Sequence, residues 1–250
     1  MRSPSEAAST GARYCSRRGY VARNPLAVLE RDELPRAQAK RESRVLNRDD
    51  LQKLLDHSPA PYKTLLATAA YTGMRLMELL GLTWGDVDFE GNVIKVRAQL
   101  SRAKKGHPAR RMPLKTKAAS RSIEIEPYLK TRLLEHKMSS GFKGDNDYVF
   151  CTEHGTPHYY RNVAVRGLEK AAKRAGLNPE GIPSLVFHDL RKTYGSHLIR
   201  QGLDVVRVSR RMGHAKPSIT LDIYAKEIEA ANHADDVTEK LTAAFGGLTW

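Results

Sequence analysis

Glycine-containing turns divide the last third of the chain into helical segments, and this pattern restricts the fold more than any other feature. Helical spacing of apolar residues over 188–201 ends at Gly202. Asp204 is a suitable cap for the next helix, VVRVSRRM, which stops at Gly213. Pro217 opens a further helix, ITLDIYAK. Short helices that follow one another closely predict a packed helical body.

The middle of the chain adds a small amount of strand. Ile94, Val96 and Ala98 alternate with polar residues, and further strands are expected near 109–115 and over 121–126. Other helices are expected after the cap residue Asn47 and at about 62–71, 74–82, 127–138, 160–175, 204–212 and 218–230. The expected fold class is therefore α+β, mainly helical, with a small antiparallel β-sheet on one side.

Composition shifts suggest three parts. In residues 1–43 we expect a disordered start (1–12), the end of a helix with a Gly-Tyr turn (13–30), and a charged linker. Residues 44–232 form the expected main domain, and residues 233–250 a C-terminal tail helix.

Charge favours a polyanionic partner. Lys and Arg number 42 against 28 Asp and Glu, which gives a net charge of +14. The alternative is a basic surface that is merely solvated. No apolar run approaches the ~20 residues needed to cross a bilayer, and no secretory signal is visible. Cys15 and Cys151 are far apart and indicate no disulfide framework, so a cytoplasmic location is expected.

One pair of residues suits phosphate chemistry. His188 and Arg191 stand three apart at a predicted helix start, so they share a face. A guanidinium can bind two phosphate oxygens while an imidazole moves a proton. Alone, this spacing is more typical of a surface pair, and residues further along the chain must decide its meaning.

The string HDLRKTYGSHLIRQGLDVVRVSRRMGHAKPSITLDIYAK resembles the signature of tyrosine recombinases, the phage integrase family. The family pattern is a His-x-x-Arg box, a Gly-His about two dozen residues on, and a nucleophilic tyrosine ten residues after that histidine. His188, Arg191, His214 and Tyr224 match it.

Two upstream motifs extend the resemblance. The family has an arginine just after a Thr-Gly break with an acidic residue following, and TGMRLMELLGLTWGDVDF offers Arg75 and Glu78. The family lysine often lies in K-T-x-x-S-x-R before an alternating strand. KTKAASRSIEI has a similar form and suggests Lys115. The resemblance covers residues 44–230.

This resemblance implies metal-free and ATP-free cleavage and rejoining of DNA through a 3′-phosphotyrosine. Arg75 and Arg191 would hold the nonbridging phosphate oxygens, and His214 would add a hydrogen bond. Tyr224 would be the nucleophile and His188 its base, because a phenol has a pKa near 10 and must lose its proton as it attacks. Lys115 would protonate the leaving 5′-oxygen. Glu78 would support Arg75 or His188.

Other residues compete for some of these roles. Lys117 is the main rival to Lys115, and Lys104 and Lys105 are further ones. Cys151, His154 and His158 spell half of a metal site without a second pair of ligands, so we expect no metal and no cofactor.

Rival functions are a type IB topoisomerase and a DNA-binding protein derived from an integrase. The absence of most of the family's N-terminal clamp suggests a shortened chain. The family implies double-stranded DNA as partner, and a homotetramer on paired sites with a monomer when free. It also implies a bacterial or phage-encoded protein, and a tail that packs in cis or in trans.

Overall fold

A computed structural model describes residues 4–24, 41, 43–103 and 108–232. The chain divides into two compact units, residues 1–42 and 43–250, and each is treated by itself. The first contains α1 (Pro4–Arg17), which ends at a turn where Gly19 has φ +76°. Residues 4–12 are therefore helical, and the expectation of a disordered start is wrong for them. Glu6, Ala7 and Ala8 are good helix formers, which the expectation overlooked.

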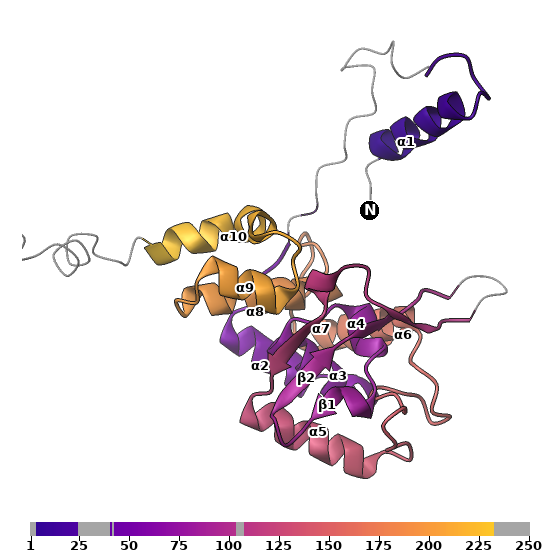
Figure 1. Cartoon of the computed structure of the whole chain (residues 1–250). Helices are drawn as coiled ribbons and strands as arrows, with labels where there is room; N and C mark the ends of the chain where they lie inside the picture. The colour runs from indigo at the N-terminus through magenta and orange to yellow at the C-terminus, as the bar shows by residue number, and fades with distance from the viewer. Residues whose placement is uncertain (1–3, 25–40, 42, 104–107, 233–250) are drawn as a thin grey trace, which may run out of the picture. The chain divides into compact units, whose positions relative to one another are not determined.

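The second unit is mainly helical (Figure 1). Its helices are α2 (Arg48–Asp56), α3 (Ala60–Thr72), α4 (Leu76–Leu80), η2 (Trp84–Asp86), η3 (Lys117–Ala119), α5 (Pro127–Ser139), α6 (Tyr160–Asn162), the π-helical η4 (Val163–Glu169), α7 (Lys170–Arg174), α8 (Phe187–Arg200), α9 (Val205–Met212) and α10 (Pro217–Asn232). Two caps expected from the sequence are confirmed. The Asn47 and Asp204 side chains accept backbone N–H bonds from Asp50 and Arg207.

The strands form two antiparallel sheets where one was expected. β1 (Val87–Asp88), β2 (Val93–Val96) and β5 (Arg121–Glu124) form one sheet in that order. β3 (Ala98–Leu100) and β4 (Arg111–Pro113) form a separate pair. Arg97 separates β2 from β3, so one continuous alternating run serves both sheets. Alternation reports which face is buried but not where a strand changes partner.

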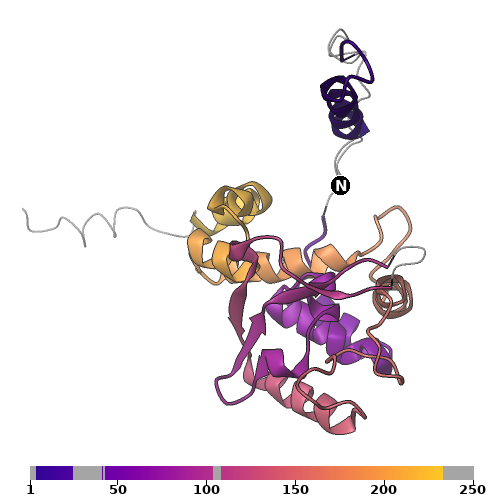
Figure 2. The same cartoon turned by 45° about the vertical axis from the view of Figure 1, so that its right-hand side comes forward.

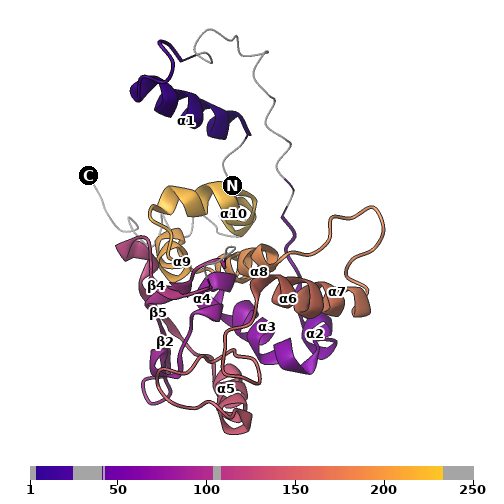
Figure 3. The same ribbon diagram turned by 90° about the vertical axis from the view of Figure 1, so that its right-hand side faces the viewer.

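Helix α3 lies at the centre of the unit and packs against α8 on one side and α5 on the other. Figure 2 and Figure 3 show α8, α9 and α10 gathered at one end of the body and α5 at the opposite end. Leu65, Leu66 and Ala69 of α3 are buried in the large core that also contains the inward residues of the three-stranded sheet. The hydrophobic effect on this core fixes α8 relative to α3.

A second, smaller apolar cluster joins α8, α9 and α10. Its buried members are Tyr194, Ile199, Val208, Met212 and Tyr224. This cluster holds α10 against the rest of the unit. Among the described residues, no helix has the length and apolar content to cross a membrane.

Candidate active site

Arg75 and Glu78 form a local pair at the start of α4. The Glu78 carboxylate accepts the Arg75 backbone N–H at 2.9 Å and its Nη1 at 2.7 Å. The arginine side chain remains 40% exposed, whereas the Glu78 side chain is 1% exposed. The left-handed Gly73 (φ +61°) ends α3 just before them and turns the chain into this position.

Glu78 has a second cationic partner in Arg121 of β5. Arg121 Nη2 lies 2.9 Å from Glu78 Oε2, and the arginine side chain is only 5% exposed. Burial acts to raise the pKa of the Glu78 carboxyl, but Arg121 and Arg75 outweigh it and hold that pKa below its ordinary value. Glu78 is therefore a carboxylate at neutral pH.

Arg191 reaches the same region from α8. It is buried, with Nη1 donating to Gly73 O at 2.7 Å and Nη2 donating to Met212 O. Burial, followed by the nearby charges of Arg75 and Arg121, lowers the pKa of Arg191 to about 9. The guanidinium therefore stays protonated at neutral pH although it is out of water.

His214 follows the left-handed Gly213 that ends α9. Its Nδ1 lies 2.8 Å from the buried Thr220 hydroxyl. Burial lowers the pKa of His214 to about 4, and the charges of Arg191, Arg75, Arg121 and His188 add to that effect. His214 is therefore neutral at pH 7. His188 is exposed at the start of α8 and is near enough for its charge to act on His214.

Tyr224 lies inside α10 at a break in the helix, with φ −116° and ψ 19°. Its ring is 1% exposed, and its hydroxyl donates to the Arg191 backbone carbonyl at 3.5 Å. The ring packs directly on α8, since a Cβ built on Gly195 would lie 2.2 Å from the Tyr224 hydroxyl. The phenol therefore lies beside Arg191.

The lysine candidates are less closely tied to this group. Lys115 is exposed between β4 and η3, and no hydrogen bond or ion pair among the described residues joins it to the arginines or Glu78. Lys117 begins η3, but its side chain lies outside the described part of the chain. Lys104 and Lys105 also lie outside it. Within the described residues, no cluster of His, Cys, Asp and Glu suits a metal ion, Cys151 and its neighbours included.

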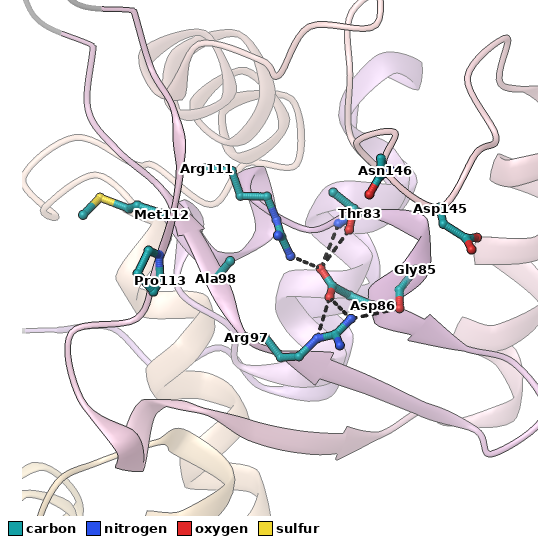
Figure 4. Close-up of a pocket in the computed structure, with 10 residues that line it drawn as sticks. All are labelled: Thr83, Gly85, Asp86, Arg97, Ala98, Arg111, Met112, Pro113, Asp145 and Asn146. Carbon is teal, nitrogen blue, oxygen red and sulfur yellow. Dashed lines mark hydrogen bonds and ion pairs between the residues drawn. The ribbon is translucent and has the colours of Figure 1, made fainter.

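A second arginine–carboxylate cluster lies at a pocket of about 620 Å³ beside the β3–β4 pair (Figure 4). The Asp86 side chain, 2% exposed, accepts from Arg97 Nη2 at 2.6 Å and from Arg111 Nη2 at 2.8 Å. None of the sequence-predicted site residues is among the described residues that line this pocket. The pocket is therefore separate from the candidate site.

Sequence reasoning missed three residues that contact this group, namely Arg121, Thr220 and Gly195. Arg121 stands inside the string KTKAASRSIEI, so its signal was present but was assigned only to the lysine. Thr220 and Gly195 stand inside the string that holds the histidines and the tyrosine. Their contacts become visible only when α8, α9 and α10 are packed together.

The candidate site thus groups arginines and histidines beside a tyrosine, on a mainly helical body with small sheets. The model of the phage integrase family matches residues 44–230. The chain belongs to this family.

Curated relatives agree with this assignment. A "Tyrosine recombinase XerC-like" protein of Caldanaerobacter subterraneus subsp. tengcongensis is 30% identical over 237 residues, which cover 86% of this chain and 59% of the relative. A "Putative prophage phiRv2 integrase" of Mycobacterium tuberculosis is 28% identical, covering 69% of this chain and 44% of the relative. The chain thus spans about three fifths of the XerC-like relative's length.

Solved structures support the fold. An integrase of the transposon Tn1549, in complex with a circular intermediate DNA, superposes with a TM-score of 0.74 at 19% identity, covering 92% of this chain and 77% of that one. The XerA recombinase superposes with a TM-score of 0.57 at 20% identity, covering 89% and 70%. At these identities the likeness concerns the fold alone.

Proposed function

We propose that this chain is the catalytic portion of a site-specific DNA recombinase that cleaves and rejoins strands through a 3′-phosphotyrosine on Tyr224. The observation that carries the proposal is the convergence of Arg75, Arg191 and His214 at the C-terminal end of α9, with the Tyr224 hydroxyl packed on α8 beside the Arg191 backbone. The names of the relatives, recombinase and integrase, favour this function over a type IB topoisomerase.

Arg75 and Arg191 are the proposed ligands of the scissile phosphate. The hydrogen bond from Arg75 Nη2 to Gly213 O is long, at 3.4 Å. A phosphate oxygen can therefore replace Gly213 O as the acceptor at a small cost in free energy. Guanidinium groups fixed before the substrate arrives stabilise the extra negative charge of the five-coordinate transition state. Glu78 supports Arg75 without touching DNA, because its side chain is buried.

His214 is proposed to donate a neutral hydrogen bond to the same oxygens. A Thr220 hydroxyl that donates to Nδ1 leaves the proton on Nε2, which becomes the donor. A neutral imidazole suits this role because three nearby guanidiniums already supply positive charge.

In the proposed step, the Tyr224 oxygen forms a bond to phosphorus as the bond from phosphorus to the 5′-oxygen breaks. The phenol proton passes to His188, and Lys115 supplies a proton to the 5′-oxygen. Attack by a 5′-hydroxyl on the phosphotyrosine reverses the step, and a hydroxyl from another duplex gives strand exchange. Because the Tyr224 ring is 1% exposed, the segment of α10 around its helical break must shift when DNA binds.

The partners follow from the same proposal. The substrate is double-stranded DNA in the cytoplasm of a bacterial cell, and four copies act on two paired sites. The N-terminal unit would belong to the family's DNA clamp. The tail 233–250, expected to form a helix, lies outside the described residues.

A trapping experiment tests the proposal. Nicked duplexes with a randomised central sequence let a short strand diffuse away after cleavage, so the protein stays attached to DNA and survives denaturation with detergent. We expect adducts with the natural chain, and none with Tyr224→Phe although it still binds DNA. Tyr194→Phe is the matched control, because Tyr194 belongs to the same apolar cluster, and it should keep adduct formation within about threefold. Adducts of undiminished yield with Tyr224→Phe would refute the proposal.

A further inference from the structure

Three guanidiniums converge on three successive carbonyl groups at the C-terminal end of α9. Arg121 Nε donates to Arg211 O at 2.7 Å, Arg191 Nη2 donates to Met212 O, and Arg75 Nη2 donates to Gly213 O at 3.4 Å. Carbonyls at a helix C-terminus lack partners within the helix and carry the negative end of its dipole. This turn therefore serves as a common anchor for three cationic side chains from α8, β5 and the start of α4.

Arg121 differs from the other two in where its remaining donors go. Nη2 binds Glu78 Oε2 at 2.9 Å, and Nη1 binds Ala119 O at 2.9 Å. Because Nε is bound to Arg211 O, all three nitrogens of this guanidinium have protein partners, and one of these partners is a carboxylate. Arg121 thus bridges the buried carboxylate under Arg75 and the turn that carries His214.

The contact between Arg121 and the α9 turn is close. A Cβ added to Gly213 would lie 3.0 Å from Arg121 Nη1 and 3.2 Å from its Cδ, and Gly213 has φ +62°. A side chain at this position would be strained and would press on the guanidinium. His214, the next residue, therefore has its position set partly by Arg121.

Charge gives the bridge a second effect. Glu78 binds two guanidiniums, so its negative charge is shared between Arg121 and Arg75. If Arg121 were absent, the whole carboxylate charge would face Arg75 and would compete with phosphate for it.

We propose that Arg121 is a positioning residue of the active site, which clamps Glu78 to the C-terminal turn of α9 and thereby holds Arg75 and His214 ready for phosphate. This proposal rests on the proposed function. It assigns no contact with DNA to Arg121.

Arg111 supplies a matched control, because it makes the same kinds of contact away from the site. Its Nη2 binds the buried Asp86 carboxylate at 2.8 Å, and its Nε binds Gly81 O at 2.9 Å. The comparison uses Arg121→Met, Arg121→Lys, Arg111→Met and Arg111→Lys in the full chain, below the melting temperature of each variant.

The first readout is the rate of covalent adduct formation under single-turnover conditions. The substrates are the nicked duplexes, selected from the randomised pool, with which the natural chain forms adducts. We expect Arg121→Met to slow the reaction about 100-fold and Arg121→Lys about tenfold, since lysine restores the charge but not the fork of donors. DNA affinity should change by less than about twofold, and both Arg111 variants should react within about threefold of the natural chain. If Arg121→Met fails to fold, Arg121→Lys decides, and a natural rate for either folded Arg121 variant overturns the proposal.

The second readout needs no DNA. NMR titration of the histidine ring protons should show a higher pKa for His214 in Arg121→Met and no change in Arg111→Met, because Arg121 is one of the charges that act on His214 beside Arg191, Arg75 and His188. An unchanged His214 titration in Arg121→Met contradicts the clamp. If instead the natural chain forms no adduct that depends on Tyr224, the proposed function fails while this titration still tests the clamp.

Discussion

Glu78 and Asp86 lie close together in the sequence and are built alike. Each is buried, accepts the backbone N–H of the residue three positions before it, and binds two arginine side chains. The two clusters differ in where their arginines spend their other donors. In the Asp86 cluster, Arg97 binds the carbonyl of Gly85 and Arg111 binds that of Gly81. Both glycines are close to Asp86 in the sequence.

At Glu78, the other donors of Arg75 and Arg121 reach the end of α9, which is far away in the sequence. That end carries His214 and lies against Arg191, whose backbone contacts Tyr224. The same local unit therefore fastens a β-hairpin in one place and assembles a candidate active site in the other. Long-range contacts decide between the two uses.

The largest expected contrast concerns the exposed arginine of each cluster. Arg75→Ala should lower the rate of adduct formation about 1,000-fold, because it removes a proposed ligand of the transition-state charge. Arg97→Ala should leave that rate within about threefold. Single-turnover kinetics on the same duplex measures both, and equal losses in the two variants would break the comparison.

The loss of unfolding free energy should also be larger when Glu78 is replaced than when Asp86 is replaced. Glu78→Gln leaves Arg121 buried without a counter-charge and should cost about 3–5 kcal/mol of unfolding free energy. Asp86→Asn should cost about 1–3 kcal/mol, because Arg97 and Arg111 are 56% and 35% exposed and can turn to water. Urea denaturation measures both values. A larger loss for Asp86→Asn would mean that its cluster is the more tightly built one.

Gly195→Ala tests the packing of Tyr224, a feature with no counterpart at Asp86. Replacing glycine by alanine inside a helix normally raises the free energy of unfolding by about 1 kcal/mol. Here its Cβ would collide with the Tyr224 ring, so we expect a loss of about 1–3 kcal/mol instead. The same change in a Tyr224→Ala background should be neutral or stabilising. A loss of the same size in both backgrounds would show that Tyr224 does not lie against Gly195.

The free energy of unfolding should depend on pH through His214, which follows the end of α9 that the arginines of the Glu78 cluster reach. The pKa of His214 falls to about 4 on folding, so the unfolded chain binds the proton more strongly. Its contribution to stability is present above pH ~6.5 and is lost as the pH falls towards about 4, by up to about 3 kcal/mol. His214→Gln should flatten the pH dependence of unfolding in that window. The decline should persist in part, because burial also lowers the pKa of His158. An unchanged slope in His214→Gln would contradict this account.

The sequence predicted the elements well where the signal is local. Helix caps at Asn47 and Asp204 and the glycine stop at Gly213 depend on neighbouring residues only, and the structure has them. The split between β2 and β3 was missed, since alternation continues through Arg97 while the partner strand changes. The helix over residues 4–12 was missed because small polar residues were interpreted as disorder.

For the candidate site, spacing in the sequence brought out the residues of the family pattern but not what surrounds them. The contacts of Arg121 with Arg211 and of Arg75 with Gly213 join segments far apart in the chain, and no local pattern encodes them. The choice of Lys115 over Lys117 stays a prediction. The sequence also did not predict which of the site residues are buried. His188 and Arg191 both lie at the start of one helix, but only Arg191 is buried.

The most direct test of the central claim is the chemical identity of the residue that bears DNA. Adducts trapped on a nicked duplex would be digested with nuclease and trypsin, and the modified peptide sequenced by mass spectrometry. We expect a nucleotide joined through its 3′-phosphate to the tyrosine of the ITLDIYAK segment, Tyr224. A nucleotide on any other side chain, or one joined through a 5′-phosphate, would contradict the central claim.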